Sequence, residues 1–101
     1  MAKVVLSAIA REDLIGIRDY IRDDLCNPDA AGRIMRVLRK SIETLEFMPE
    51  HGAPLDSVIP YHTEYRYLTC EAYRIFYLYD GDTVEIIRIL HNLQDYMKAL
   101  F

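Results

Sequence analysis

Residues 73–90 read YRIFYLYDGDTVEIIRIL, and this stretch decides the fold. In residues 73–79 and 83–90, side chains alternate with period two and are rich in aromatic and branched types, a pattern that predicts two strands. Asp80, Gly81 and Asp82 lie between the two segments and supply the turn of a hairpin. Residues 61–69 show the same alternation just upstream. We therefore expect three sequential strands in an antiparallel meander.

The first half of the chain carries helical spacing instead. A short β-prone run at residues 3–6 is followed by Ser7, which suits the N-cap of a helix. Asn27 and Pro28 then interrupt the pattern and fit the start of a second helix ending near residue 48, because proline is favoured at the first helical position. Two apolar stripes are predicted to face the core: Leu14, Ile17, Ile21 and Leu25 on the first helix, and Ile34, Leu38, Ile42 and Leu45 on the second.

The remaining segments complete an α+β architecture. Residues 49–60 contain Gly52 and prolines and predict a loop, while residues 95–101 predict one or two helical turns. We expect a single domain over residues 1–101 with the order β-α-α-β-β-β and a short C-terminal helix. An N-terminal strand leads into an α-helical hairpin packed on one face of a mostly antiparallel sheet. The other face is expected to remain open for a partner or substrate.

Composition and charge limit the functions that the chain can carry. Hydrophobic residues make up 51% of the chain and charged residues 28%, which is the balance of a folded domain. Residues 1–60 hold 8 basic and 10 acidic residues and residues 61–101 hold 4 and 6, so neither half suits nucleic-acid binding by phosphate neutralisation alone. No apolar run reaches the roughly 20 residues of a membrane span. With two distant cysteines and no secretory signal, we expect a cytoplasmic protein without a membrane role.

Short motifs follow one another along the chain in a distinctive order. The central ones are YRIFY at residues 73–77, DGDTVEI at residues 80–86 and RILH at residues 88–91. The others are LS at residues 6–7, DYI at 19–21, IETL at 42–45, MPEHG at 48–52 and the closing segment at 91–96. Together they resemble the RelE/ParE toxin superfamily over essentially the whole chain, and their order and spacing make the resemblance specific.

This resemblance implies the toxin of a bacterial type II toxin–antitoxin system, neutralised by a cognate antitoxin that wraps a segment around it. RelE-like toxins are endoribonucleases that cut mRNA, usually in the ribosome, whereas ParE-like toxins inhibit DNA gyrase and are not known as nucleases. Metal-independent cleavage of mRNA is the leading hypothesis. Non-enzymatic inhibition of DNA gyrase is the alternative.

RNA cleavage without a metal requires a group that activates the 2′-hydroxyl, a cation that stabilises the charged transition state and an acid for the leaving oxygen. Arg74, His91 and Tyr96 are of the required types, and the leading hypothesis assigns them as catalytic. RelE-like nucleases carry an arginine at the strand position matching Arg74, and some use a C-terminal aromatic residue that matches Tyr96. A structural role for His91 and a core-packing role for Tyr96 are the competing interpretations.

Two further arginines are candidates for binding RNA or another phosphate group. A hairpin centred on Gly81 would place Arg74 directly opposite Arg88, and like charges so placed repel unless an anion lies between them. That anion would be a phosphate or a carboxylate of the antitoxin. Arg66, on the preceding strand, is predicted to add a phosphate contact. Neutralisation of one arginine by Glu64, Glu71 or Glu85 is the alternative.

The chain also departs from the RelE-like pattern. Lysines usually occupy the strand where residues 65–69 here read YRYLT, and the closing segment is usually arginine-rich where residues 92–95 read NLQD. These departures count against cleavage that depends on the ribosome. The histidines lack the spacing and companions of a zinc site, and no glycine-rich phosphate loop is present. We therefore expect neither a metal nor a cofactor.

Overall fold

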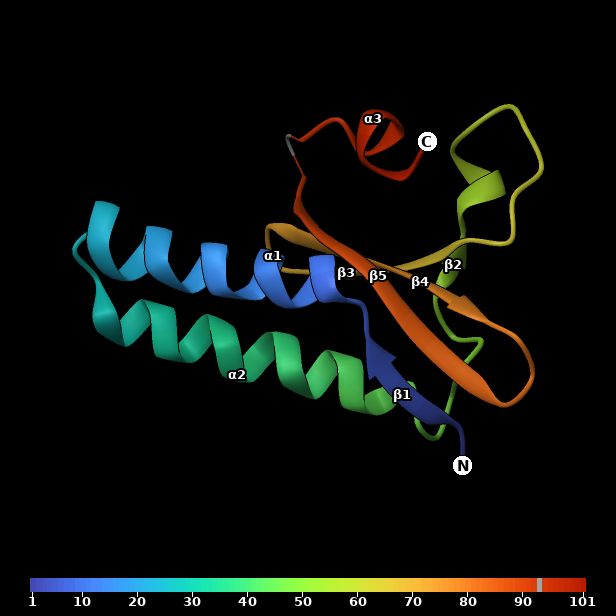
Figure 1. Cartoon of the computed structure of the whole chain (residues 1–101), viewed down its shortest axis with the longest axis horizontal. Helices are drawn as coiled ribbons and strands as arrows, with labels where there is room; N and C mark the ends of the chain where they lie inside the picture. Colours follow the sequence, from blue (N-terminus) through green and yellow to red (C-terminus); the bar gives the residue numbers. More distant parts are fainter. Residues whose placement is uncertain (93) are drawn as a thin grey trace.

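The computed structural model describes residues 1–92 and 94–101 and has an α+β architecture (Figure 1). Its elements are β1 (Lys3–Leu6), α1 (Ala8–Asp19), the π-helical turn η1 (Tyr20–Asp24), α2 (Pro28–Thr44), β2 (Ala53–Pro54), the 3₁₀ turn η2 (Leu55–Ser57), β3 (Arg66–Cys70), β4 (Tyr73–Tyr79), β5 (Thr83–His91) and α3 (Tyr96–Leu100). One sheet has the strand order β1-β5-β4-β3-β2, with β1 parallel to β5 and the other neighbours antiparallel. The predicted fold class is confirmed. Among the described residues, no helix has the length and apolar character to cross a membrane.

Side-chain caps set where the two long helices begin. Ser7 Oγ accepts a hydrogen bond from the N–H of Ala10 at 3.0 Å, and the Asn27 side chain does the same for Ala30 at 3.1 Å. Pro28 opens α2, at a position where the helix needs no N–H donor. Both predicted starts are confirmed. The two helices form an antiparallel hairpin whose connecting turn projects away from the sheet (Figure 1).

The hairpin differs from the prediction in two ways. Helix α2 ends at Thr44 rather than near residue 48. Helix α1 continues into η1, where the N–H of Leu25 donates to the carbonyl oxygen of Tyr20, five residues earlier. This wider turn shifts the helical phase beyond the buried Ile21, so Leu25 is 56% exposed and its predicted place in the core is wrong. The other seven stripe residues are buried or pack against the core.

The connection between α2 and β3 is more structured than predicted, and β3 starts later. Elements β2 and η2 lie within the predicted loop, and β3 begins at Arg66 rather than at residue 61. The side chain of Asp56 accepts a hydrogen bond from the N–H of Thr63 at 2.7 Å. Such a local bond competes with a strand ladder, so residues 61–65 remain a loop in spite of their alternation.

The turn between β4 and β5 closes one residue later than a turn centred on Gly81 would. The N–H of Asp80 donates to the carbonyl oxygen of Thr83 at 3.2 Å, and Asp80 Oδ1 accepts the N–H groups of Asp82 and Thr83. Gly81 has a φ of 100°, a conformation that favours glycine. The hairpin register is therefore moved by one residue from the predicted one.

A β-bulge at Ile87 in β5 moves the register by one more residue. Arg74 consequently pairs with Leu90, while Arg88 pairs with Phe76. The predicted pairing of Arg74 with Arg88 is wrong, because counting from the turn assumes an unbroken ladder. The two shifts together restore the alternation, so both arginines still leave the same face of the sheet.

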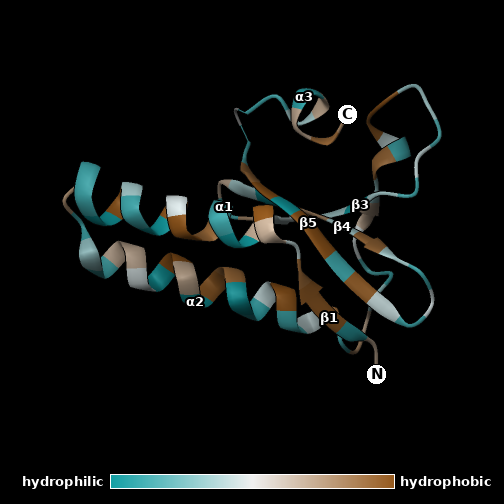
Figure 2. Ribbon diagram, viewed as in Figure 1, coloured by the Kyte–Doolittle hydropathy of each residue, from teal (hydrophilic) through white to brown (hydrophobic). Residues whose placement is uncertain are grey.

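Apolar side chains gather on both faces of the sheet. Hydrophobic residues line the strands beside the hairpin, whereas the end of α1 far from the sheet is mostly hydrophilic (Figure 2). The helix-side cluster, between the hairpin and the sheet, comprises Ala10, Ile21, Ala31, Ile34, Leu38, Ile42, Leu45, Cys70, Ile75, Tyr77, Val84, Ile86 and Ile89. The second cluster comprises Leu55, Ile59, Phe76 and Leu90, with Tyr65, Tyr67, Tyr96, Met97, Ala99 and Leu100 packed against it. Since η2 and α3 contribute to the second cluster, the expectation of a wholly open face is wrong.

Candidate functional site

Arg74 lies between two aromatic rings beside the second cluster. Its guanidinium carbon is 5.5 Å from the ring centre of Tyr67 and 5.7 Å from that of Tyr96. Strand β3 supplies Tyr67, and α3 supplies Tyr96 through an N-cap in which Asp95 Oδ1 accepts N–H groups of the first turn. A cation over an aromatic face contributes about 0.5–2 kcal/mol. Two of the three residues predicted to be catalytic thus contact each other.

The polar atoms of Arg74 have few partners. Its Nε is buried and has no hydrogen-bond partner among the described residues. No ion pair within residues 1–92 and 94–101 includes this arginine. A buried donor left unpaired costs about 1–3 kcal/mol. Arg74 is therefore a positively charged group between two aromatic rings that still has an N–H able to donate a hydrogen bond.

His91 lies on the opposite face of the sheet from Arg74. It pairs in register with Tyr73, and the two rings meet edge to face with their centres 5.5 Å apart. Its backbone N–H donates to Oε1 of Gln94 at 2.7 Å. Arg74 follows Tyr73 in β4, and successive residues of a strand point to opposite faces. The sheet therefore separates His91 from Arg74 and Tyr96.

Arg88 is bound to Asp13 of α1. Its Nε lies 2.9 Å from Asp13 Oδ2 and its Nη2 lies 3.0 Å from Oδ1, with side chains 23% and 14% exposed respectively. The same carboxylate accepts the N–H of Ile89 at 2.9 Å. The hydrogen bond with Asp13 raises the pKa of Arg88. Arg88 is thus neutralised by Asp13 rather than by one of the three glutamates considered from the sequence.

Arg66 helps to close the loop that follows α2. Its Nη1 donates to the carbonyl oxygens of Glu50 at 3.0 Å and Gly52 at 2.8 Å. The N–H of Gly52 donates to Tyr77 Oη at 3.0 Å, and burial raises the pKa of this tyrosine. Arg66 pairs in register with Tyr77 of the helix-side cluster, so the structure does not bring it together with Arg74.

A groove of about 610 Å³ lies between the hairpin and the end of the sheet that carries His91. Ile17 and Ile89 are among the apolar residues that line it, and the exposed Tyr20 and Leu25 border it. Gly16 opens one wall, because a Cβ added there would meet no atom within 4 Å. Apolar surface of this kind is typical of sites that bind other proteins.

The comparisons with known proteins identify the family. Residues 4–96 match the family model described as the ParE toxin of the type II toxin–antitoxin system, parDE. The chain belongs to this family. The predicted RelE/ParE superfamily is thereby confirmed, and the family implies an antitoxin partner.

One solved structure, described as a chromosomal ParDE TA system from P. aeruginosa, resembles this ParE-family toxin with a TM-score of 0.74. The match covers 90% of this chain and 96% of that one at 24% sequence identity, so the likeness concerns the fold alone. None of the curated proteins matches this toxin.

Sequence reasoning missed two parts of the toxin's surface, the groove and the role of Asp13. The available signal was Gly16, because glycine inside a helix costs about 1 kcal/mol relative to alanine and often marks a position where space is needed. Asp13 gave no signal, since its partner is 75 residues away in the chain. In the part of the chain that the structure describes, no three His, Cys, Asp or Glu side chains are placed to hold a metal ion.

Proposed function

We propose that this toxin inhibits DNA gyrase by binding it, without catalysing a reaction, and that the antitoxin prevents that binding. The family supports gyrase as the target, because ParE-like toxins inhibit this enzyme. The observation that carries the proposal is the separation of the candidate catalytic groups. His91 lies on one face of the sheet and Arg74 with Tyr96 on the other. Acid–base catalysis needs its groups within hydrogen-bond reach of one reacting centre, so this arrangement supports binding rather than cleavage.

The distribution of charge supports the same proposal. Arg88 is neutralised by Asp13, and Arg66 Nη1 donates to two loop carbonyl oxygens, so both guanidinium groups are less available to a phosphate than free ones would be. The formal net charge of the whole chain is −4. A protein that binds RNA as a polyanion depends on clustered cations. The groove instead combines apolar side chains with the carboxylates of Glu12 and Asp13, and we assign to it the contact with the target.

Gly16→Trp tests this assignment. Because a side chain added at Gly16 meets no atom at its Cβ, the indole is expected to occupy the groove while the fold is retained. We expect the concentration of toxin needed for half-inhibition of gyrase supercoiling to rise at least about tenfold, which corresponds to about 1.4 kcal/mol of lost binding. The measurement is a supercoiling assay with purified gyrase, with RNA integrity followed in the same samples.

Ile15→Trp is the matched control, since Ile15 is an exposed neighbour in α1 that does not line the groove. It introduces the same indole and is expected to leave inhibition within about twofold of the unmodified toxin, as surface substitutions usually do. Equal inhibition by Gly16→Trp and Ile15→Trp would remove the groove from the proposal. Intact supercoiling together with cleaved RNA, in the unmodified toxin, would overturn the proposal itself.

Endoribonuclease activity is a second candidate, favoured by one observation. The guanidinium carbon of Arg74 lies 5.7 Å from the ring centre of Tyr96 on one face of the sheet, and Nε of this arginine has no hydrogen-bond partner among the described residues. If RNA is the substrate, Arg74→Ala is expected to lower cleavage by about 10²-fold, the scale of a lost electrostatic stabiliser. Full toxicity of a folded Arg74→Ala variant, with intact transcripts and failing supercoiling, would exclude this candidate.

A further inference from the structure

The segment between β2 and β3 folds back over the second cluster. Leu55 and Ile59 of this segment are buried in the cluster. The N–H of Leu55 donates to the carbonyl oxygen of Tyr65 at 2.9 Å and joins the two ends. Residues 55–65 therefore form a closed loop, called here the 55–65 loop, and this loop covers part of the face that carries Arg74.

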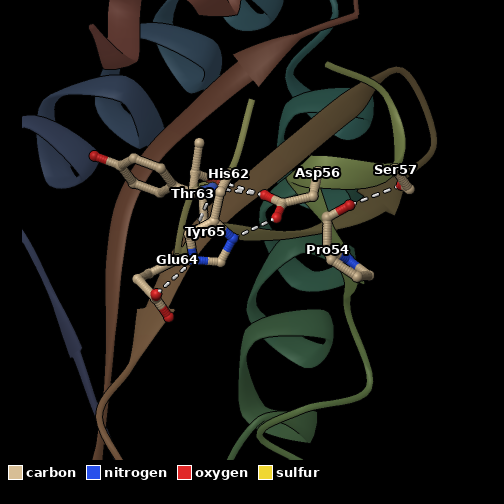
Figure 3. Close-up of polar contacts among 7 residues, drawn as sticks. All are labelled: Pro54, Asp56, Ser57, His62, Thr63, Glu64 and Tyr65. Carbon is tan, nitrogen blue, oxygen red and sulfur yellow. Dashed lines mark hydrogen bonds and ion pairs between the residues drawn. The ribbon is translucent and has the colours of Figure 1, made fainter. Parts of the chain in front are cut away.

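Asp56 and His62 tie the two sides of the 55–65 loop together (Figure 3). Asp56 Oδ1 accepts the N–H of Thr63 at 2.7 Å and its hydroxyl at 3.2 Å. Asp56 Oδ2 lies 2.8 Å from Nδ1 of His62. The other ring nitrogen, Nε2, lies 3.1 Å from Oε1 of Glu64. A single imidazole thus bridges two carboxylates across the loop.

The chemistry of this bridge favours the imidazolium form of His62. An ionised carboxylate only accepts hydrogen bonds, so both ring nitrogens must donate, and only the imidazolium carries a proton on both. The hydrogen bond with Asp56, followed by that with Glu64, raises the pKa of His62 above its ordinary value of 6.5. The N–H of Thr63, followed by the bond to His62, lowers the pKa of Asp56 below 3.8.

We propose that His62 is a pH-responsive clasp, which holds the 55–65 loop closed over the second cluster while it is an imidazolium and loosens the loop when it becomes neutral. The proposal does not depend on which molecule the toxin attacks. It also assigns the loop a link to Arg74, because Tyr96 belongs to the same second cluster and its ring lies against the guanidinium.

The direction of the pH effect follows from the two titrating groups. Since the pKa of His62 is raised by folding, its contribution is complete below the ordinary value of 6.5 and is lost as the pH rises through the raised value. Since the pKa of Asp56 is lowered, its contribution is present above 3.8 and is lost as the pH falls through the lowered value. The clasp is therefore strongest at mildly acidic pH.

Carboxylates lie close to the clasp. Asp56 and Glu64 contact the ring directly. Glu64 also lines a surface hollow together with Asp80 and Glu85, from the β4–β5 turn and β5. Asp56 and Glu64 both favour the imidazolium, and they repel each other once His62 is neutral.

Hydrogen exchange of the full chain, followed by NMR at the amide of Thr63, tests the proposal. Between about pH 5.5 and about pH 8.5, where histidine titrates, the protection factor of this amide is expected to fall about two- to five-fold, the range that an exposed ion pair contributes. His62→Gln keeps a polar side chain that never titrates here. Its Thr63 protection should be low and independent of pH.

His51→Gln is the matched control, because His51 is exposed and bonded to Thr44 outside the loop. It is expected to preserve the pH dependence of the unmodified chain. The proposal is overturned if Thr63 protection is as independent of pH in the unmodified chain as in His62→Gln. A pKa of His62 at or below its ordinary value, measured by NMR titration, would overturn it as well.

Discussion

The two clusters on the two faces of the sheet are built in different ways. Among residues 1–92 and 94–101, the helix-side cluster contains 13 buried residues and is covered by two long helices, whereas the second cluster contains 4 and is covered by η2, a loop and the short α3. The helix-side cluster is buried by apolar residues that recur with helical spacing. The second cluster is buried by single residues of a loop and a short helix. Arg74, Tyr96 and the clasp all lie on the face of the second cluster. The face with the smaller buried cluster therefore carries the unpaired Nε of Arg74 and the titrating His62.

The largest effect on the free energy of unfolding is expected from truncating a leucine of the helix-side cluster to alanine. Leu38 is 1% exposed, and Leu38→Ala should lower the free energy of unfolding by about 3–5 kcal/mol, because it leaves a cavity between α2 and the sheet. Leu55 of the second cluster is 0% exposed, yet Leu55→Ala should cost only about 2 kcal/mol, since the loop around it can partly collapse. Urea denaturation of both variants measures the difference.

Hydrogen exchange adds a second measure of the same comparison. Leu55→Ala should speed exchange in the 55–65 loop and in α3 while the amides of α2 stay protected. If Leu55→Ala destabilises the protein as much as Leu38→Ala, the two clusters form one cooperative unit and the contrast between them fails.

A smaller effect is expected where the hairpin meets the sheet. Asp13→Asn removes the charge that neutralises Arg88 and weakens the acceptor for the N–H of Ile89, so we expect a loss of about 1–3 kcal/mol in the free energy of unfolding. Asp19→Asn is the control, because Asp19 forms exposed ion pairs with Arg18 and Arg22 and should cost less than about 1 kcal/mol. Thermal unfolding resolves the two, and equal losses would show that burial of the Asp13 pair is unimportant.

The smallest effect is expected at α3. Tyr96→Leu keeps apolar volume but removes the ring that faces Arg74, so the free energy of unfolding should fall by about 0.5–1 kcal/mol. Tyr61→Leu, at an exposed loop position, is the control and should change it little. The contrast is sharpened if exchange accelerates in α3 alone. An effect as large as that of Asp13→Asn would place α3 within the main cooperative unit.

Sequence patterns predicted the regular part of this molecule well. Ser7, Asn27 and Pro28 marked the helix starts because capping is a local property of the chain. The stripe failed at Leu25, where a π-helical turn changes the period without any local residue that requires it. The site was less accessible, because the strand partner of Arg74 depends on a register that one added residue alters, and the partner of Arg88 lies 75 residues away in the chain.

That added residue, Ile87, also governs which changes in length β5 can tolerate. Val84 and Ile86 before it and Ile89 after it all belong to the helix-side cluster, although an uninterrupted strand would send Ile89 to the other side. Deleting Ile87 would join Ile86 to Arg88 in regular alternation and keep Ile89 on the helix side, whereas inserting one residue after Ile87 would exchange the faces of all residues from Arg88 to His91 and turn the guanidinium toward the helix-side cluster. Relatives of this toxin should accept insertions and deletions in the loops that flank β5, but between the Gly81 turn and His91 the only tolerated change in length should be loss of the bulge residue itself.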